Sequence, residues 1–183
     1  MDITQEEIKK LLEIEKIEKD NKDLIITCIR KQTFELKSSE NNKIKFKLNT
    51  FFSENIKDKY TLNLNYSLYG LNLCRIDING FEHRNPNYFT GNPLLDEYKG
   101  AIISESHIHI AQVGDKKVEN WAIPLKRIFN EEDINKIEKV VDFFRNKINL
   151  KSNVTFYKKN KIEEYESQSL FWTKEVKWWK WII

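Results

Sequence analysis

The amino-acid sequence predicts an α+β fold: an antiparallel meander sheet flanked by an N-terminal helix and by a second helix in the C-terminal half, followed by a strand-like, tryptophan-rich tail. Three observations lead to this prediction. Two segments have the apolar periodicity of helices, several segments between them alternate apolar and polar residues as strands do, and helices do not alternate with strands as in a doubly wound α/β fold. We therefore expect a single domain over residues 1–183, with a core over 1–148 and the tail as an extension over 149–183.

Both predicted helices begin at recognisable caps. Thr4 and Glu7 have the spacing of a capping box, and the apolar residues after them predict a first helix over residues 4–19. Asn130 is a good N-cap and three acidic residues follow it, which favours a second helix over residues 131–148. Its apolar stripe consists of Ile134, Ile137, Val140, Val141, Phe144 and Ile148.

The segments between the helices predict antiparallel strands, because apolar and polar residues alternate along them. These segments are 24–29 or 33–36, then 43–48, 60–70 and 71–80. Turns are expected at Gly70 and at the dipeptide Asn79-Gly80. Residues 84–100 are expected to form a long loop, and the tail to form one or two further strands.

The composition argues against several classes of protein. Hydrophobic residues make up 40% of the chain and charged residues 32%, which suits a folded soluble domain rather than a disordered chain. No apolar run approaches the length that spans a bilayer, so we expect a cytoplasmic protein of a bacterial host. Two cysteines without CxxC spacing support neither a disulfide framework nor a cysteine-ligated zinc site. The net charge of +3 does not by itself indicate nucleic-acid binding, and the lysine clusters are interpreted as solvated faces.

The middle third of the chain carries the candidate functional site. All five glycines, all three prolines and all three histidines lie between Gly70 and Pro124. In a strand, residues two apart share a face, so His107 and His109 project together, as do Arg75 and Asp77 on the preceding strand. If the two strands pair, we expect these four side chains to meet on the open face of the sheet. His83 and Arg84 would join them from the turn after Asn79-Gly80.

Three functions compete for this block. Two imidazoles and a carboxylate could bind a metal, although the spacing lacks a specific zinc signature, and we expect neither metal nor cofactor. Two imidazoles could instead act as general base and general acid of a metal-independent ribonuclease, whose residues would be His107, His109, Arg75 and Asp77. The block could also bind unpaired RNA bases through stacking and hydrogen-bonding side chains. The residues of that surface would be His83, Arg84, Asn85, Asn87, Tyr88, Phe89, His107, His109 and Trp121.

A purely structural role for the histidines is the fourth alternative, in which they cap a cross-strand ladder and satisfy backbone groups of the loop. The tryptophan-rich tail is open to two interpretations as well. Its large side chains complete the core, or they form a patch that docks a protein partner. The residues concerned are Trp172, Trp178, Trp179 and Trp181.

Three blocks of sequence, RIDINGFEHRNP, SHIHIAQV and WAIPL, resemble the signature of a family of small bacterial and phage proteins of unknown function. Members carry an R-x-D-x-x-x-x-x-H-x-N-P element, a G-x-H-I-H element and a W-A-x-P-L element before a C-terminal helix. The resemblance covers roughly residues 1–148, and residues 104–106 replace the glycine that usually precedes the histidines. The matching residues are Arg75, Asp77, His83, Asn85, Pro86, His107, His109, Trp121, Ala122, Pro124 and Leu125.

The resemblance implies a function connected with RNA. Some relatives are suspected of acting as RNA-directed anti-CRISPR proteins, and a weaker similarity to small toxins implies a ribonuclease. The first expectation is therefore a phage-type or mobile-element protein that binds RNA or a CRISPR effector ribonucleoprotein and inhibits a host defence system. The alternatives are a ribonuclease of a toxin–antitoxin pair and a non-enzymatic protein that docks through its tail.

Overall fold

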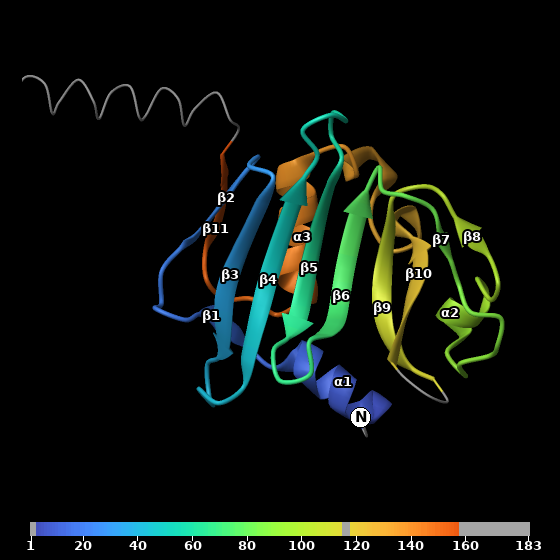
Figure 1. Ribbon diagram of the computed structural model, residues 1–183, viewed down its shortest axis with the longest axis horizontal. Helices are drawn as coiled ribbons and strands as arrows, with labels where there is room; N and C mark the ends of the chain where they lie inside the picture. The colour runs from blue at the N-terminus through green and yellow to red at the C-terminus, as the bar shows by residue number, and fades with distance from the viewer. Residues whose placement is uncertain (1–2, 115–117, 158–183) are drawn as a thin grey trace, which may run out of the picture.

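A computed structural model describes residues 3–114 and 118–157 of the chain (Figure 1). Its centre is a seven-stranded sheet in which all neighbouring strands are antiparallel. In spatial order the strands are β1 (Lys16–Glu18), β3 (Lys31–Ser38), β4 (Lys45–Phe52), β5 (Tyr60–Tyr66), β6 (Leu71–Ile78), β9 (His107–Val113) and β10 (Val118–Pro124). This arrangement confirms an α+β fold with a mostly antiparallel sheet.

Helices cover one face of this sheet. Helix α1 (Gln5–Glu13) packs against β6 and β9, and α3 (Ile137–Lys147) lies behind the sheet in Figure 1. Alternate strand residues point toward the helices and form the core, together with residues such as Ile8 of α1 and Phe144 of α3. Burial of these apolar side chains is the main source of stability, at about 25 cal/mol for each Å² removed from water. Among the described residues, none of the helices combines the length and apolarity needed to cross a membrane.

The first helix is shorter than the sequence predicts. The capping box of Thr4 and Glu7 is present, but α1 ends at Glu13, and the dihedral angles of Ile14 are φ −53° and ψ 130°. Residues 16–18 then form β1, which pairs with β3. The expectation of a helix to residue 19 was wrong because strand pairing with a distant segment replaces the last helical turns.

The second helix also begins later than expected. Asn130 caps a short 3₁₀ helix, Glu131–Asp133, and α3 starts only at Ile137. Two further 3₁₀ or helical turns were not predicted: Leu125–Arg127 and α2 (Pro93–Asp96). Helix α2 has Asn92 as its N-cap and a proline in its first turn, so the expected long loop is partly helical.

A small second sheet joins an early segment of the chain to the last described one. The sequence offered residues 24–29 or 33–36 as the first strand, and both segments form strands. The first contains β2 (Leu24–Thr27) and the second lies within β3. Strand β2 pairs in parallel with β11 (Val154–Tyr157). Residues 154–157 belong to the segment expected as an extension, so the fold continues beyond residue 148. Strand β5 ends at Tyr66, earlier than expected, and Leu68 is exposed.

The opposite face of the large sheet carries polar side chains, and we call it the polar face. In register, one row across it runs Thr33, Asn49, Asn63, Arg75 and His109. Hydrogen bonds link side chains across these strands, from the Thr33 hydroxyl to Asn49 Oδ1 at 2.8 Å and from Asn49 Nδ2 to Asn65 Oδ1 at 2.9 Å. The alternation seen in the sequence therefore separates an apolar core face from a polar one.

Residues 81–103 lie beside β9 and β10 and are called the cover segment (Figure 1). They contain β7 (His83–Arg84), α2 and β8 (Ile102–Ile103), and β7 pairs with β8. The cover segment contacts β10 through α2 and β8, and its His83 ring lies against the rings of His107 and His109 on β9. We call this end of the polar face the covered half, and the part over β3, β4 and β5 the open half.

Candidate functional site

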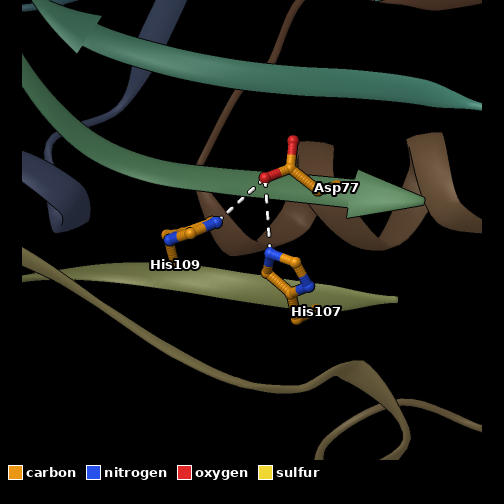
Figure 2. Close-up of side chains that lie close together, drawn as sticks. All are labelled: Asp77, His107 and His109. Carbon is orange, nitrogen blue, oxygen red and sulfur yellow. Dashed lines mark hydrogen bonds and ion pairs between the residues drawn. The ribbon is translucent and has the colours of Figure 1, made fainter. Parts of the chain in front are cut away.

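Strands β6 and β9 pair so that the predicted site residues lie directly opposite one another. Arg75 is the partner of His109, and Asp77 is the partner of His107. The four side chains therefore share one face of the sheet, as the sequence predicts, and Figure 2 shows both imidazoles directed at the Asp77 carboxylate. Together with His83, these four residues are called the histidine cluster.

Asp77 is the centre of the histidine cluster. Its Oδ2 lies 2.9 Å from His109 Nε2, 2.9 Å from Arg75 Nε and 3.5 Å from His107 Nε2. Its Oδ1 accepts a hydrogen bond of 2.6 Å from the Thr61 hydroxyl. Burial raises the pKa of Asp77, but its contacts with the two imidazoles, with Thr61 and with the Arg75 charge outweigh burial and hold the pKa well below its usual range. Asp77 is therefore an anion at neutral pH.

His107 is fixed by a backbone carbonyl. Its Nδ1 lies 2.6 Å from the carbonyl oxygen of Glu105, which can only accept, so Nδ1 carries the proton of this hydrogen bond. Its Nε2 is buried and has no hydrogen-bond partner among the residues that the structure describes. The ring is therefore held in one orientation, with Nε2 aimed at Asp77.

The Nε2 of His109 faces a hydrogen-bond acceptor and a hydrogen-bond donor at the same time. Its Nε2 is 2.9 Å from Asp77 Oδ2, which requires a donor, and 2.7 Å from Arg75 Nη2, which requires an acceptor. Burial lowers the pKa of His109 to about 4, against the opposing contact with Asp77, and the Arg75 charge lowers it further. His109 is therefore a neutral imidazole at pH 7, and its Nδ1 is buried without a hydrogen-bond partner in the described part of the chain.

The cover segment closes the histidine cluster from above. The ring of His83 stands edge-on to that of His109, with centroids 4.6 Å apart, and burial lowers the pKa of His83. His107 is 1% exposed and His109 0%. The expectation that these histidines lie on an open face was wrong, because the loop after the turn folds back over them. The sequence gives no sign of this cover.

Several residues of the expected RNA-binding surface hold the cover segment in place. The side-chain amide of Asn85 accepts from the Ala122 N–H at 2.8 Å and donates to the Ala122 carbonyl at 2.7 Å, so it pairs with the edge of β10 as a strand residue would. Tyr88 packs edge-on against the buried Trp121 and donates to Glu119 at 2.9 Å. Asn85 and Trp121 are both buried, and in this conformation they are covered from any base.

Other residues of that expected surface are exposed. Arg84 and Asn87 are open to solvent, and Phe89 is 71% exposed with Lys99 Nζ 3.6 Å from its ring centroid. Their contact with RNA stays a prediction. The four tryptophans of the tail, Trp172, Trp178, Trp179 and Trp181, lie outside the described residues.

Two contributors to the cluster were not identified from the sequence. Thr61 faces Asp77 across β5 and β6, which only the register of the two strands shows. Gly80 allows the turn to close over the site, since a Cβ there would lie 2.8 Å from the Cβ of Asp77. The glycine of the Asn79-Gly80 turn was recognised as a turn signal but not as a close neighbour of the carboxylate.

Comparison with known proteins identifies a family and no activity. A family model described as a family of unknown function, DUF6978, matches residues 3–150. No curated protein matches the chain. No solved structure matches it either. The match confirms the resemblance to a family of unknown function, and the link to anti-CRISPR proteins stays a prediction.

Proposed function

The chain belongs to the family of unknown function DUF6978, and from this premise we propose that it binds single-stranded RNA through the open half of its polar face. The observation that carries the proposal is a hollow of about 380 Å³ on β3 and β4 whose lining has more basic than acidic residues. Lys19, Lys37, Lys45 and Lys47 line it, and Glu35 is the one acidic residue among the described residues of the lining.

The charges in this hollow do not cancel. Glu35 forms an ion pair of 2.8 Å with Lys19, which leaves Lys37, Lys45 and Lys47 without an ion-pair partner among the residues that the structure describes. Three uncompensated ammonium groups on adjacent strands suit an anionic backbone, because binding releases the counterions held by the phosphates.

The neighbouring side chains on the open half could contact bases. The amide groups of Asn49, Asn63 and Asn65 lie on this face, where they hydrogen-bond to one another and to Asn72, and binding of a base would exchange some of these hydrogen bonds. Phe51 is 40% exposed on the same face. Single-stranded RNA is recognised by hydrogen bonds to base edges together with stacking on aromatic rings. The proposal keeps RNA as the partner and moves the main contact from the histidine block to β3 and β4.

The resemblance suggests a biological setting for this binding. A CRISPR effector carries single-stranded guide RNA. The anti-CRISPR expectation is therefore that the chain binds and inhibits such a ribonucleoprotein. The ribonuclease alternative also stays a prediction. Its supposed acid and base, His107 and His109, are buried and face Asp77 rather than an open surface.

Fluorescence anisotropy of a labelled single-stranded RNA, titrated with the full chain at several salt concentrations, tests the proposal. The double variant Lys45→Ala/Lys47→Ala should bind about tenfold or more weakly. The slope of log affinity against log salt should fall by about 0.7 for each phosphate that the variant no longer neutralises. Lys139→Ala, on the exposed side of α3, is the matched control and should bind as the wild type does.

Two results would overturn the proposal: no binding by the wild type at low salt, or equal losses for the double variant and for Lys139→Ala. RNA cleaved by the wild type, and left intact by His107→Ala, would favour the ribonuclease instead.

A further inference from the structure

The histidine cluster has the geometry of a cation site. One oxygen of Asp77 and one nitrogen each of His107 and His109 lie within 4.8 Å of one another, and all three residues are buried (Figure 2). They come from neighbouring strands, so the sheet itself fixes their spacing.

Polar atoms of the cluster face one another without a hydrogen bond between them. The Glu105 carbonyl accepts from Nδ1 of His107, which turns the ring's Nε2 toward Asp77 Oδ2, 3.5 Å away, and among the described residues this buried Nε2 has no hydrogen-bond partner. A buried polar atom without a partner is unfavourable unless a proton or a metal ion lies between it and the group that it faces. A backbone carbonyl on the far nitrogen is also the partner that orients a metal-binding histidine.

A cation already lies at this point. The guanidinium of Arg75 places Nη2 2.7 Å from His109 Nε2 and Nε 2.9 Å from Asp77 Oδ2. The Arg75 side chain is 33% exposed, so it has a path to solvent that the two histidines lack. Arg75 therefore supplies a positive charge at the point toward which Asp77, His107 and His109 are directed.

We propose that the chain binds one divalent transition-metal ion of the zinc class through Asp77 Oδ2, His107 Nε2 and His109 Nε2, with Arg75 turned toward solvent. Two imidazoles and one carboxylate are ligands that Zn²⁺ and similar ions accept, whereas Mg²⁺ and Ca²⁺ prefer oxygen ligands. The Nε2 of His83 is also buried without a hydrogen-bond partner within residues 3–114 and 118–157, beside the ring of His109, and is the candidate for a fourth ligand. This site differs from the absence of metal that the sequence leads us to expect, and it does not depend on RNA binding.

Titration of the full chain, first stripped with a chelator, tests the site directly. Calorimetry with ZnCl₂ should show one site per chain, and addition of Co²⁺ should produce the visible absorption of a cobalt ion bound by imidazole. Mg²⁺ should give neither signal. Zinc should also raise the melting temperature, because a ligand that binds only the folded state stabilises it.

Four variants separate a metal site from a polar network closed by Arg75. Asp77→Asn and His107→Gln each remove one ligand and should weaken zinc binding about a hundredfold or more, with circular dichroism confirming that both fold. Arg75→Gln removes the competing cation and should bind zinc as tightly as the wild type or more tightly. His83→Gln should lose less affinity than either ligand variant, since three ligands remain.

The wild-type titration keeps the test decisive even if a variant does not fold. Failure of the wild type to bind either Zn²⁺ or Co²⁺ would overturn the proposal. Binding that persists unchanged in both Asp77→Asn and His107→Gln would also overturn it, since the ion would then lie elsewhere.

Discussion

Two charged groups are buried toward opposite edges of the same sheet, and the protein accommodates them in different ways. On β1, the Lys16 Nζ donates to the carbonyl oxygens of Leu12 and Ile14 at 3.0 and 2.7 Å and lies 4.8 Å from the Phe46 ring centroid. Lys16 has no carboxylate partner among the described residues, and burial lowers its pKa to about 7. On β6, Asp77 instead meets a guanidinium, two imidazoles and a hydroxyl.

The two sites differ in whether buried polar atoms remain without hydrogen-bond partners. The Lys16 ammonium is held by the carbonyls at the end of α1 and by an aromatic face, which is an arrangement that fixes a helix to a strand. The histidine cluster keeps one ring nitrogen of each of its three histidines buried without a hydrogen-bond partner among the described residues. Buried polar atoms without partners are costly, so a site that retains several of them is expected to bind something.

The largest expected effect comes from uncovering the histidine cluster. Asn85→Ala leaves the Ala122 N–H and carbonyl and the Tyr98 carbonyl without their side-chain partner, which should lower the free energy of unfolding by about 3 kcal/mol or more. Hydrogen exchange should then increase across β7 and β10 but not at β1. Urea unfolding measures the loss, and Asn87→Ala, an exposed neighbour, should change stability by less than about 0.5 kcal/mol. Equal effects of the two variants would contradict the role given to Asn85.

The next effect concerns Lys16 and its dependence on pH. The unfolded chain keeps the Lys16 proton up to its ordinary pKa of 10.5, whereas the folded chain releases it near 7. Between these values the unfolded state binds more protons, so stability should rise with pH, by at most about 1.4 kcal/mol per pH unit. Below pH 7 the lysine is charged in both states and the cost of burial is present in full.

Lys16→Met should remove this rise. Urea unfolding at several pH values from about 6 to 9 should show the wild type gaining stability relative to the variant. Lys9→Met, on the exposed side of α1, is the control and should follow the wild-type curve. Parallel curves for wild type and Lys16→Met would mean that Lys16 keeps its proton in the folded state. Both buried groups would then be charged at neutral pH.

The smallest expected effect compares two threonines on the polar face. Thr61→Val removes a hydroxyl that donates to the buried Asp77 carboxylate, which should cost about 1.5 kcal/mol or slightly more. Thr33→Val removes an exposed hydrogen bond to Asn49 and should cost about 0.5 kcal/mol. Thermal unfolding of both variants measures the difference, and equal losses would show that a hydrogen bond to the buried Asp77 carboxylate contributes no more than an exposed one.

Local periodicity in the sequence was enough to predict which residues share a face of the sheet. The alternation in LNLCRIDI and HIHIAQV places Arg75 with Asp77 and His107 with His109, because side chains in a strand point to opposite sides in turn. The same local rule separates the core side chains of β4 and β5 from the polar ones. The capping box of α1 was also readable, since all of its atoms lie within a few residues.

What lies opposite and above these faces depends on contacts between distant segments. The pairing of Asp77 with His107 joins positions 30 residues apart, and its register depends on how β6 and β9 fit together. The cover over the histidines depends on hydrogen bonds between Asn85 and Ala122, and the end of α1 depends on the pairing of β1 with β3. Each of these contacts gains its free energy between segments that are distant in the chain, so local periodicity, which reports only on neighbouring residues, carries no record of them.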